Sequence, residues 1–349
     1  MRFVMIGAGA IGGVVGGQLA KAGFDVLFVD KLREHVDAIN RDGLRLKGVH
    51  GPHTLRVPAV TGVGAVAFRP DDVVVLSVKS FHTDQACREL RGSTPLDLPV
   101  LCAQNGVRNE ETAARYFREV DGVMVLIGAK RLVPGEVVHT AKGPLGIGTY
   151  PSGLSPAARQ VADALAKTDL PVYTTERIAA HKWHKMLVNL NNATFGLTGL
   201  SGDEARADPE VRAWMADVYE EGVRVVRAAG IPYEGAPGAA AIEDRIRELR
   251  SPSAPAVVSV EEEAKHRPSL WQDLYHRTGE VEADSFNGEI VRLGGQHGVP
   301  TPYSSLLLGL IGELAARRAG PGSYTIGALR TRLLEALGGD VDEVDRGRP

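Results

Sequence analysis

Residues Phe3–Gly12 read F-V-M-I-G-A-G-A-I-G, and this stretch decides the fold. Its four apolar residues predict a short buried strand, and the glycines that follow have the spacing G-x-G-x-x-G at the start of a helical pattern. In this pattern the first glycine permits a tight turn, the second lets the main chain approach a pyrophosphate, and the third lets the helix pack on the strand. The stretch therefore predicts a dinucleotide-binding turn formed by Gly7, Ala8, Gly9, Ala10, Ile11 and Gly12, with a tight turn that binds no ligand as the alternative.

The next predicted strand, Asp25–Asp30, ends in residues that bear on the choice of cofactor. Asp30 would bind a ribose 2′-hydroxyl and so favours NAD, whereas Lys31 and Arg33 could hold a 2′-phosphate and favour NADP. Because the two cations could also screen the Asp30 carboxylate, we expect NADP(H) to be preferred, with NAD(H) as the alternative.

Two further predicted strands also end in polar residues. Asp72–Val78 is followed by Lys79, and Pro99–Ala103 is followed by Gln104, Asn105 and Gly106. Open α/β sheets bind ligands at the carboxyl ends of their strands. Lys79 is therefore a candidate contact for a phosphate or carboxylate, and Asn105 for the nicotinamide or the substrate. An ordinary loop cation and a turn asparagine before glycine are the alternatives.

The chain has 349 residues, which favours two domains. We predict an α/β, Rossmann-like, doubly wound domain over residues 1–177, an all-helical domain over 178–335 and a polar tail over 336–349. Within the first domain, residues 44–46 and 54–60 predict a short β-excursion. The segments Val137–His139 and Leu145–Gly148 are separated by Gly and Pro, which is typical of a hairpin.

Residues 181–192 read H-K-W-H-K-M-L-V-N-L-N-N. As a helix, this segment places Lys182, Lys185, Asn189 and Asn192 on one stripe. A lysine with an asparagine one turn later suits a carbonyl substrate, since the ammonium can donate a proton and the amide can orient the group. A solvated basic stripe is the alternative.

A second polar cluster lies in residues 269–287, where Glu280, Glu282 and Asp284 alternate with other residues. A surface acidic run is one interpretation. The other is that one of these acids faces Lys185 across a cleft. The histidines have no metal-ligand spacing, so no metal site is expected.

Composition excludes several classes of protein. The formal net charge of −3 does not favour nucleic acid or anionic lipid as a partner. The chain contains only two cysteines, which argues against a disulfide framework and fits a reducing cytoplasm. No signal-peptide pattern and no membrane-spanning apolar run is evident, so we expect a cytoplasmic protein without a membrane partner.

Taken together, the motifs resemble the ketopantoate reductases (2-dehydropantoate 2-reductases) over nearly the whole chain. The resemblance depends on G-A-G-A-I-G at 7–12, S-V-K at 77–79, Q-N-G at 104–106, W-H-K-M-L-V-N at 183–189, R-P-S-L-W-Q-D at 267–273 and E-A-D-S-F-N-G at 282–288. It implies that Lys185 protonates the keto oxygen and that Lys79 lies beside the cofactor. It also implies that Asn105 and Asn189 position cofactor and substrate.

In the same way, the resemblance implies that Ser269 holds the substrate carboxylate and that Glu282 engages the substrate hydroxyl and the surroundings of Lys185. The chain departs from the family where a further asparagine is usual, because that position is Ala193. Asn192 could replace it only with a shifted geometry. The segment between Ser269 and Glu282 is also one residue longer, which affects the expected substrate more than the chemistry.

The implied function is NADPH-dependent reduction of a small-molecule 2-keto acid, with 2-dehydropantoate reduced to pantoate in pantothenate and coenzyme A biosynthesis as the expected reaction. One alternative is a related 2-keto acid or opine-type dehydrogenase on the same fold. Another is a non-catalytic protein that senses NAD(P)H, because fold alone does not establish function. A helical second domain is also compatible with a homodimer.

Overall fold

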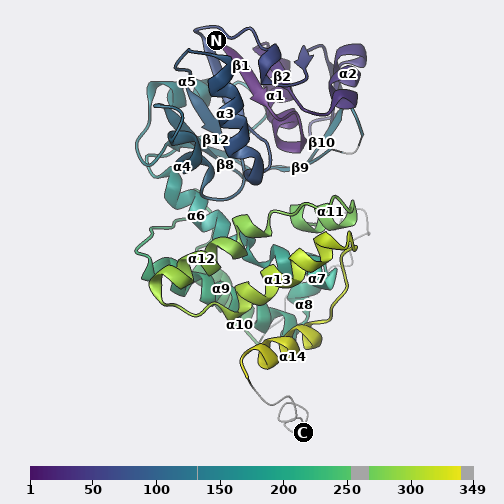
Figure 1. Ribbon diagram of the computed structural model, residues 1–349, viewed down its shortest axis with the longest axis vertical. Coiled ribbons are helices and arrows are strands. Elements are labelled where there is room, and N and C mark those ends of the chain that lie inside the picture. Colours follow the sequence, from purple (N-terminus) through teal and green to yellow (C-terminus); the bar gives the residue numbers. More distant parts are fainter. Residues whose placement is uncertain (132, 253–266, 339–349) are drawn as a thin grey trace. The chain divides into compact units, whose positions relative to one another are not determined.

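The computed structural model describes residues 1–131, 133–252 and 267–338. The chain forms two compact units, Met1–Lys182 (unit 1) and Trp183–Pro349 (unit 2) (Figure 1). The boundary between the units lies inside helix α6 (Ile178–Val188). The sequence predicted a boundary at the start of this helix, between residues 177 and 178. Of the predicted polar tail, residues 339–349 lie outside the described residues.

Unit 1 contains an eight-stranded sheet with the order β12-β11-β8-β7-β6-β1-β2-β5. Neighbouring strands are parallel except β8 and β11, which are antiparallel. The chain proceeds from β1 to β2 on one side and returns to β6 on the other, so the strand order reverses at β1. This confirms the predicted doubly wound topology. The strands are β1 (Arg2–Ile6), β2 (Asp25–Val29), β5 (Ala59–Val60), β6 (Asp72–Leu76), β7 (Val100–Cys102), β8 (Val120–Val125), β11 (Leu145–Thr149) and β12 (Val172–Thr174).

Alternate residues of the central strands enter two different hydrophobic clusters, because side chains alternate between the faces of a sheet. In β1, Phe3 and Met5 belong to one cluster, whereas Val4 and Ile6 belong to the other. Helices α1 (Ala10–Lys21), α2 (Arg33–Asp42) and α5 (Pro156–Leu165) contribute to the first cluster. Helices α3 (Thr83–Ser93) and α4 (Asn109–Ala114) contribute to the second. Both faces of the sheet are therefore covered, which explains the continuous apolar runs in its strands.

A second sheet of four strands has the order β4-β3-β10-β9. It contains β3 (Leu44–Gly48), β4 (His53–Leu55), β9 (Gly128–Arg131) and β10 (Glu136–Ala141). The predicted hairpin of Val137–His139 with Leu145–Gly148 is wrong, because β10 pairs with β9 and β3 while β11 pairs with β8 and β12 in the main sheet. Leu145 and Ile147 are fully buried in the main core, so long-range burial overrides the local turn signal.

Helix α1 lies between the two sheets, and its small residues allow both contacts. A Cβ built on Gly16 would lie 2.6 Å from the Phe28 ring, which belongs to the main sheet. A Cβ on Gly13 would lie 2.6 Å from Val137, which belongs to the small sheet. The run of glycines in α1 is therefore required by close packing on two sides.

Helices are the regular secondary structure that the described residues of unit 2 form, as the sequence predicts. Helix α9 begins at Pro209 after Asp208, whose side chain accepts hydrogen bonds from the main-chain N–H groups of Glu210 and Val211. After α6 come η3 (Asn189–Asn191), α7 (Asn192–Thr198), α8 (Gly202–Ala207), α9 (Pro209–Ala228), α10 (Ile242–Arg250), α11 (Ser269–Tyr275), η5 (Ala283–Ser285), α12 (Asn287–His297), α13 (Pro302–Ala316) and α14 (Ile326–Ala336). Among the described residues, no helix is long and apolar enough to cross a membrane.

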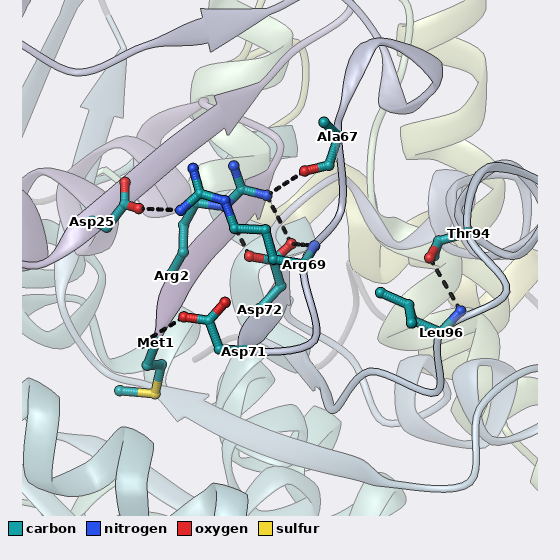
Figure 2. A network of polar contacts seen from close by, with 9 residues as sticks. All are labelled: Met1, Arg2, Asp25, Ala67, Arg69, Asp71, Asp72, Thr94 and Leu96. Carbon is teal, nitrogen blue, oxygen red and sulfur yellow. Dashed lines mark hydrogen bonds and ion pairs between the residues drawn. The ribbon is translucent and has the colours of Figure 1, made fainter.

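A buried ion pair joins the amino-terminal ends of β1 and β6 (Figure 2). Arg2 donates from Nε and Nη2 to the two carboxylate oxygens of Asp72, at 2.8 Å each, and the side chains are 8% and 0% exposed. Arg2 also donates to the carbonyl of Ala67, while the main-chain N–H of Arg69 donates to Asp72. The hydrogen bond from Arg2 to Asp72 raises the pKa of the guanidinium. This cluster stabilises the amino-terminal ends of these two strands, and the glycine turn follows the other end of β1.

We expect Arg2→Met to lower the free energy of unfolding by about 3–5 kcal/mol, because it leaves the buried Asp72 carboxylate without its cation. The matched control is Arg69→Met, which breaks the exposed pair with Asp25, whose side chains are 52% and 49% exposed. That change should cost less than about 1 kcal/mol. Urea unfolding of both variants measures the difference. An equal loss of unfolding free energy in the two variants would contradict the claim that burial makes the Arg2–Asp72 pair more important than the exposed pair.

Candidate functional site

The predicted glycine turn lies at the carboxyl end of β1, between the ends of β2 and β6. Gly7 has φ +100°, a backbone conformation that favours glycine, and its N–H donates to the carbonyl of Val29 at 2.8 Å. On the other side, the Ser77 hydroxyl donates to the carbonyl of Gly7 at 2.7 Å. The turn is thus held by both neighbouring strands at the point where the strand order reverses, and this is where doubly wound sheets bind ligands.

The three glycines of the motif have different surroundings. A Cβ on Gly12 would lie 2.0 Å from the carbonyl oxygen of Gly7 and 2.3 Å from the Ser77 hydroxyl oxygen. A Cβ on Gly9 meets no atom of the described residues within 4 Å. Gly12 is therefore required by packing inside the protein, whereas the space over Gly9 is open at the amino end of α1. An open glycine at a helix N-terminus fits the pyrophosphate of a dinucleotide.

The peptide groups on either side of Ala8 are held by two side chains. The N–H of Ala8 donates to Asp30 Oδ2 at 2.9 Å, and the carbonyl of Ala8 accepts from His35 Nε2 at 2.8 Å. His35 Nδ1 in turn accepts from the N–H of Gly135 at 2.9 Å, so the imidazole is neutral with its proton on Nε2. Burial lowers the pKa of His35, which agrees with that state. His35 thereby ties the glycine turn to the small sheet.

Asp30 and Lys31, the residues expected to select the cofactor, differ in burial and in their hydrogen-bond partners. Both carboxylate oxygens of Asp30 accept main-chain N–H groups, from Ala8 and from Leu32, and the residue is buried. Lys31 is exposed, and its Nζ lies 3.0 Å from His82 Nε2. Asp30 is therefore a structural residue of the turn. A cation and an imidazole lie beside it, in the loops that follow β2 and β6.

Lys79 and Asn105 also lie at the carboxyl edge of the main sheet. Lys79 follows β6 and precedes the short helix η2 (Ser80–His82), and it is half-buried. Asn105 follows β7 and is half-buried too. Its main-chain carbonyl accepts hydrogen bonds from Ser80 Oγ at 2.8 Å and from Asn109 Nδ2 at 2.6 Å.

The two lysines of the predicted stripe have different environments. Lys182 is 6% exposed and forms an ion pair with Glu110, which is 2% exposed. The alternative of a solvated basic stripe is therefore wrong for Lys182, because α4 supplies a buried carboxylate that the local sequence does not show. Lys185 is one turn later in α6 and half-buried.

Two motifs of unit 2 meet at the end of α6. The helix tightens into η3, so Asn189 and Asn192 follow Lys185 across a change from α to 3₁₀ geometry. Asn287, from the motif at 282–288, donates from Nδ2 to the carbonyl of Leu190 at 3.3 Å. Glu282 lies just before η5, which packs on α12 and α13, and it is 5% exposed. The surface-run alternative is therefore wrong for Glu282.

Ser269 is the first residue of α11, which packs on α7. The contact is close at Gly196, where a Cβ would lie 2.6 Å from Leu270. Just before Ser269, the Arg267 guanidinium donates to the carbonyl of Gly199 and lies 4.8 Å from the centre of the Trp271 ring. The motif at 267–273 is thus held against the end of α7, and Ser269 and Asn192 are carried by elements that pack together.

Sequence reasoning missed His35, Asn109 and Glu110. Of these, Asn109 and Glu110 follow the Q-N-G motif within a few residues. That proximity is the feature of the sequence that could have identified them. His35 gives no such signal, since its two partners are main-chain groups of the glycine turn and of Gly135. Among the described residues, no group of three or more His, Cys, Asp or Glu side chains is placed to hold a metal ion.

Comparison with known proteins gives matches along both units. Residues 3–152 match the family model described as ketopantoate reductase PanE/ApbA, and residues 177–315 match its C-terminal counterpart. The chain is 30% identical to a 2-dehydropantoate 2-reductase of Pyrococcus abyssi over 312 residues, which covers 89% of this chain and 97% of that protein. It is 28% identical to a protein of the same name from Archaeoglobus fulgidus over 314 residues, with 89% and 96% covered.

Solved structures agree with these matches. A PanE/ApbA family ketopantoate reductase from Ralstonia eutropha has a TM-score of 0.77 and 29% identity, covering 91% of this chain and 99% of that one. D-mandelate dehydrogenase, in a complex with NADH and anilino(oxo)acetate, has a TM-score of 0.79 at 24% identity, with 91% and 99% covered. The second likeness concerns the fold.

Proposed function

The chain belongs to the ketopantoate reductase family, and from that premise we propose that it reduces 2-dehydropantoate to pantoate. It is an oxidoreductase that uses a nicotinamide cofactor and acts on a CH–OH group. The observation that most supports the proposal is the pair of glycines at the turn. Gly12 is closed by the protein itself, while Gly9 leaves space at the amino end of α1. Such a turn fits a dinucleotide rather than a purely structural role.

When bound, the nicotinamide supplies the hydride that adds to the C2 carbonyl of the keto acid. The keto oxygen then gains negative charge, which a cationic donor stabilises before it delivers a proton. We assign this donor role to Lys185. The ammonium loses one proton to the new hydroxyl and regains it from solvent after product release.

We assign the remaining predicted residues to orientation. Asn105 and Asn189 would position the nicotinamide and the substrate, with Asn192 as a further amide. Ser269 would hold the substrate carboxylate. Glu282 would accept a hydrogen bond from the substrate hydroxyl and influence Lys185, and its burial favours such a directed contact over a solvated one. Lys79 would lie beside the cofactor phosphates.

The function is tested by measuring oxidation of NADPH and NADH side by side with ketopantoate and a panel of other 2-keto acids. The panel includes pyruvate with and without an amino acid, and the keto acid that corresponds to mandelate. We expect the highest kcat/KM with ketopantoate. Faster turnover of pyruvate plus an amino acid would support an opine-type dehydrogenase instead. Cofactor binding without turnover of any keto acid would support the NAD(P)H sensor.

We further propose NADP(H) as the preferred cofactor. Asp30 is used by the turn itself, so its carboxylate is less available to select a ribose hydroxyl. Lys31 lies beside it as an exposed cation.

Lys31→Ala should raise the KM for NADPH by about 10- to 150-fold, as expected for a lost charge-assisted hydrogen bond worth about 1.5–3 kcal/mol. The KM for NADH should stay within about threefold, because NADH has no 2′-phosphate. Lys21→Ala, which breaks an ion pair with Asp169, is the control and should change neither KM. Parallel losses for both cofactors in the Lys31 variant would refute this selectivity.

A further inference from the structure

The loop that carries Asn105 is held by a directed chain of hydrogen bonds that passes through two other elements of unit 1. It begins at the Gln104 side chain and ends at the main-chain carbonyl of Asn105, so that both ends are on the same loop. Its intermediate members are Thr83, at the start of α3, and Asn109, at the start of α4. All three side chains, those of Gln104, Thr83 and Asn109, are 5% exposed or less.

The direction of every bond in this chain is fixed by chemistry. The Asn105 carbonyl can only accept, so the Asn109 atom that lies 2.6 Å from it is the NH₂ group. Asn109 Oδ1 then accepts from the Thr83 hydroxyl at 2.7 Å. The Thr83 oxygen in turn accepts from Gln104 Nε2 at 2.9 Å. Each of the three side chains therefore has one orientation that satisfies its neighbour in the chain.

A second donor reaches the same carbonyl. Ser80, in the short helix that follows Lys79, donates from Oγ to the Asn105 carbonyl at 2.8 Å. The Asn105 carbonyl thus has two donors, one from the loop after β6 and one from α4. These bonds end on the main chain, so they fix the position from which the Asn105 side chain extends.

We propose that Asn109, oriented by Thr83, is a positioning residue for the reduction. It touches neither cofactor nor substrate in this account and acts through Asn105. The inference rests on the proposed function, in which Asn105 aligns the nicotinamide or the keto acid. Loss of Asn109 removes one of the donors that hold the Asn105 carbonyl, and a displacement of about 1 Å in a positioning group costs about 100-fold in rate.

The test uses variants of the full-length enzyme. Asn109→Ala removes the donor, Thr83→Val removes the hydroxyl at nearly unchanged shape, and Thr83→Ser keeps the hydroxyl. The control is Asn40→Ala, because Asn40 also clamps main chain in unit 1, with bonds of 2.9 Å to the N–H and the carbonyl of Ala59. For each variant we would measure kcat, both KM values, the Kd for NADPH by fluorescence, thermal stability, and hydrogen–deuterium exchange of residues 103–108 without ligands.

We expect kcat to fall by about 100-fold in Asn109→Ala and by about tenfold in Thr83→Val, with the Kd for NADPH within about threefold of wild type. Exchange of residues 103–108 should become faster in both. Thr83→Ser should restore kcat to within about twofold. Asn40→Ala should lose stability without losing kcat. Because Thr83→Val keeps its shape, it serves as the test if Asn109→Ala does not fold.

Two results would overturn the inference. One is a kcat near wild type in folded Asn109→Ala and Thr83→Val. The other is a fall in kcat that is matched by Asn40→Ala and follows the loss of stability. If the wild-type protein reduces no keto acid, the proposed function fails instead, and the exchange measurement still decides whether Asn109 holds the loop.

Discussion

Lys185→Ala is expected to lower kcat by about 100- to 10,000-fold, the usual contribution of a positioned general acid. The physical reason is that the keto oxygen becomes an alkoxide as hydride adds to the carbon. Without the ammonium, that charge has no donor and water must supply the proton. The cofactor should still bind, because the glycine turn proposed to hold its pyrophosphate is formed by Gly7–Gly12 and is left intact by this change. Stopped-flow turnover with ketopantoate measures kcat, and NADPH fluorescence measures binding.

Lys182 provides the matched control, because it lies one helical turn earlier in the same helix. Its ammonium pairs with the buried Glu110, so Lys182→Ala leaves a buried carboxylate without its cation. We expect a loss of about 3–5 kcal/mol in the free energy of unfolding. Lys185→Ala should therefore lower kcat, whereas Lys182→Ala should lower the free energy of unfolding. A Lys185→Ala enzyme that turns over near the wild-type rate would remove Lys185 from the mechanism.

Gly9→Ala is expected to weaken NADPH binding by about 5- to 150-fold. This factor corresponds to about 1–3 kcal/mol for one methyl group forced against a closely packed ligand. The fold should be unaffected, because a Cβ at this position meets no atom of the described residues within 4 Å. The backbone there has φ −68°, which alanine also adopts. Isothermal titration with NADPH and a thermal melt of the ligand-free protein measure the two effects.

Gly12→Ala should behave in the opposite way. Its Cβ would lie 2.0 Å from the Gly7 carbonyl oxygen, so α1 must move away from the turn. We expect the ligand-free protein to lose about 1–3 kcal/mol of stability, or about 2–12 °C in Tm. If Gly9→Ala bound NADPH as tightly as wild type, the pyrophosphate would not lie over this glycine.

The strand–turn–helix at the amino end could be predicted because all its determinants are local. The apolar run fixes β1, the glycines fix the turn, and β1 and α1 are found where the pattern placed them. The hairpin prediction failed at Leu145–Gly148 for the opposite reason. The glycine and proline between the segments are consistent with a turn, but burial of Leu145 and Ile147 in the main sheet decides the pairing.

The residues of the candidate site also differ in whether local sequence was enough to predict them. Residue types at strand ends and on α6 identified Asn105, Lys79 and Lys185 as candidates, because chemistry and position along the chain were enough. The role of Asp30 as an anchor for Ala8, and the pairing of Lys182 with Glu110, depend on partners 22 and 72 residues away. No local pattern encodes such partners.

The central claim is that this chain transfers hydride from a reduced nicotinamide to C2 of ketopantoate. It is tested most directly with NADPH that carries deuterium at both C4 positions, by mass spectrometry and proton NMR of the product. The account predicts pantoate with a single deuterium, bound at C2. Unlabelled pantoate, or no pantoate from folded enzyme that binds NADPH, would contradict it.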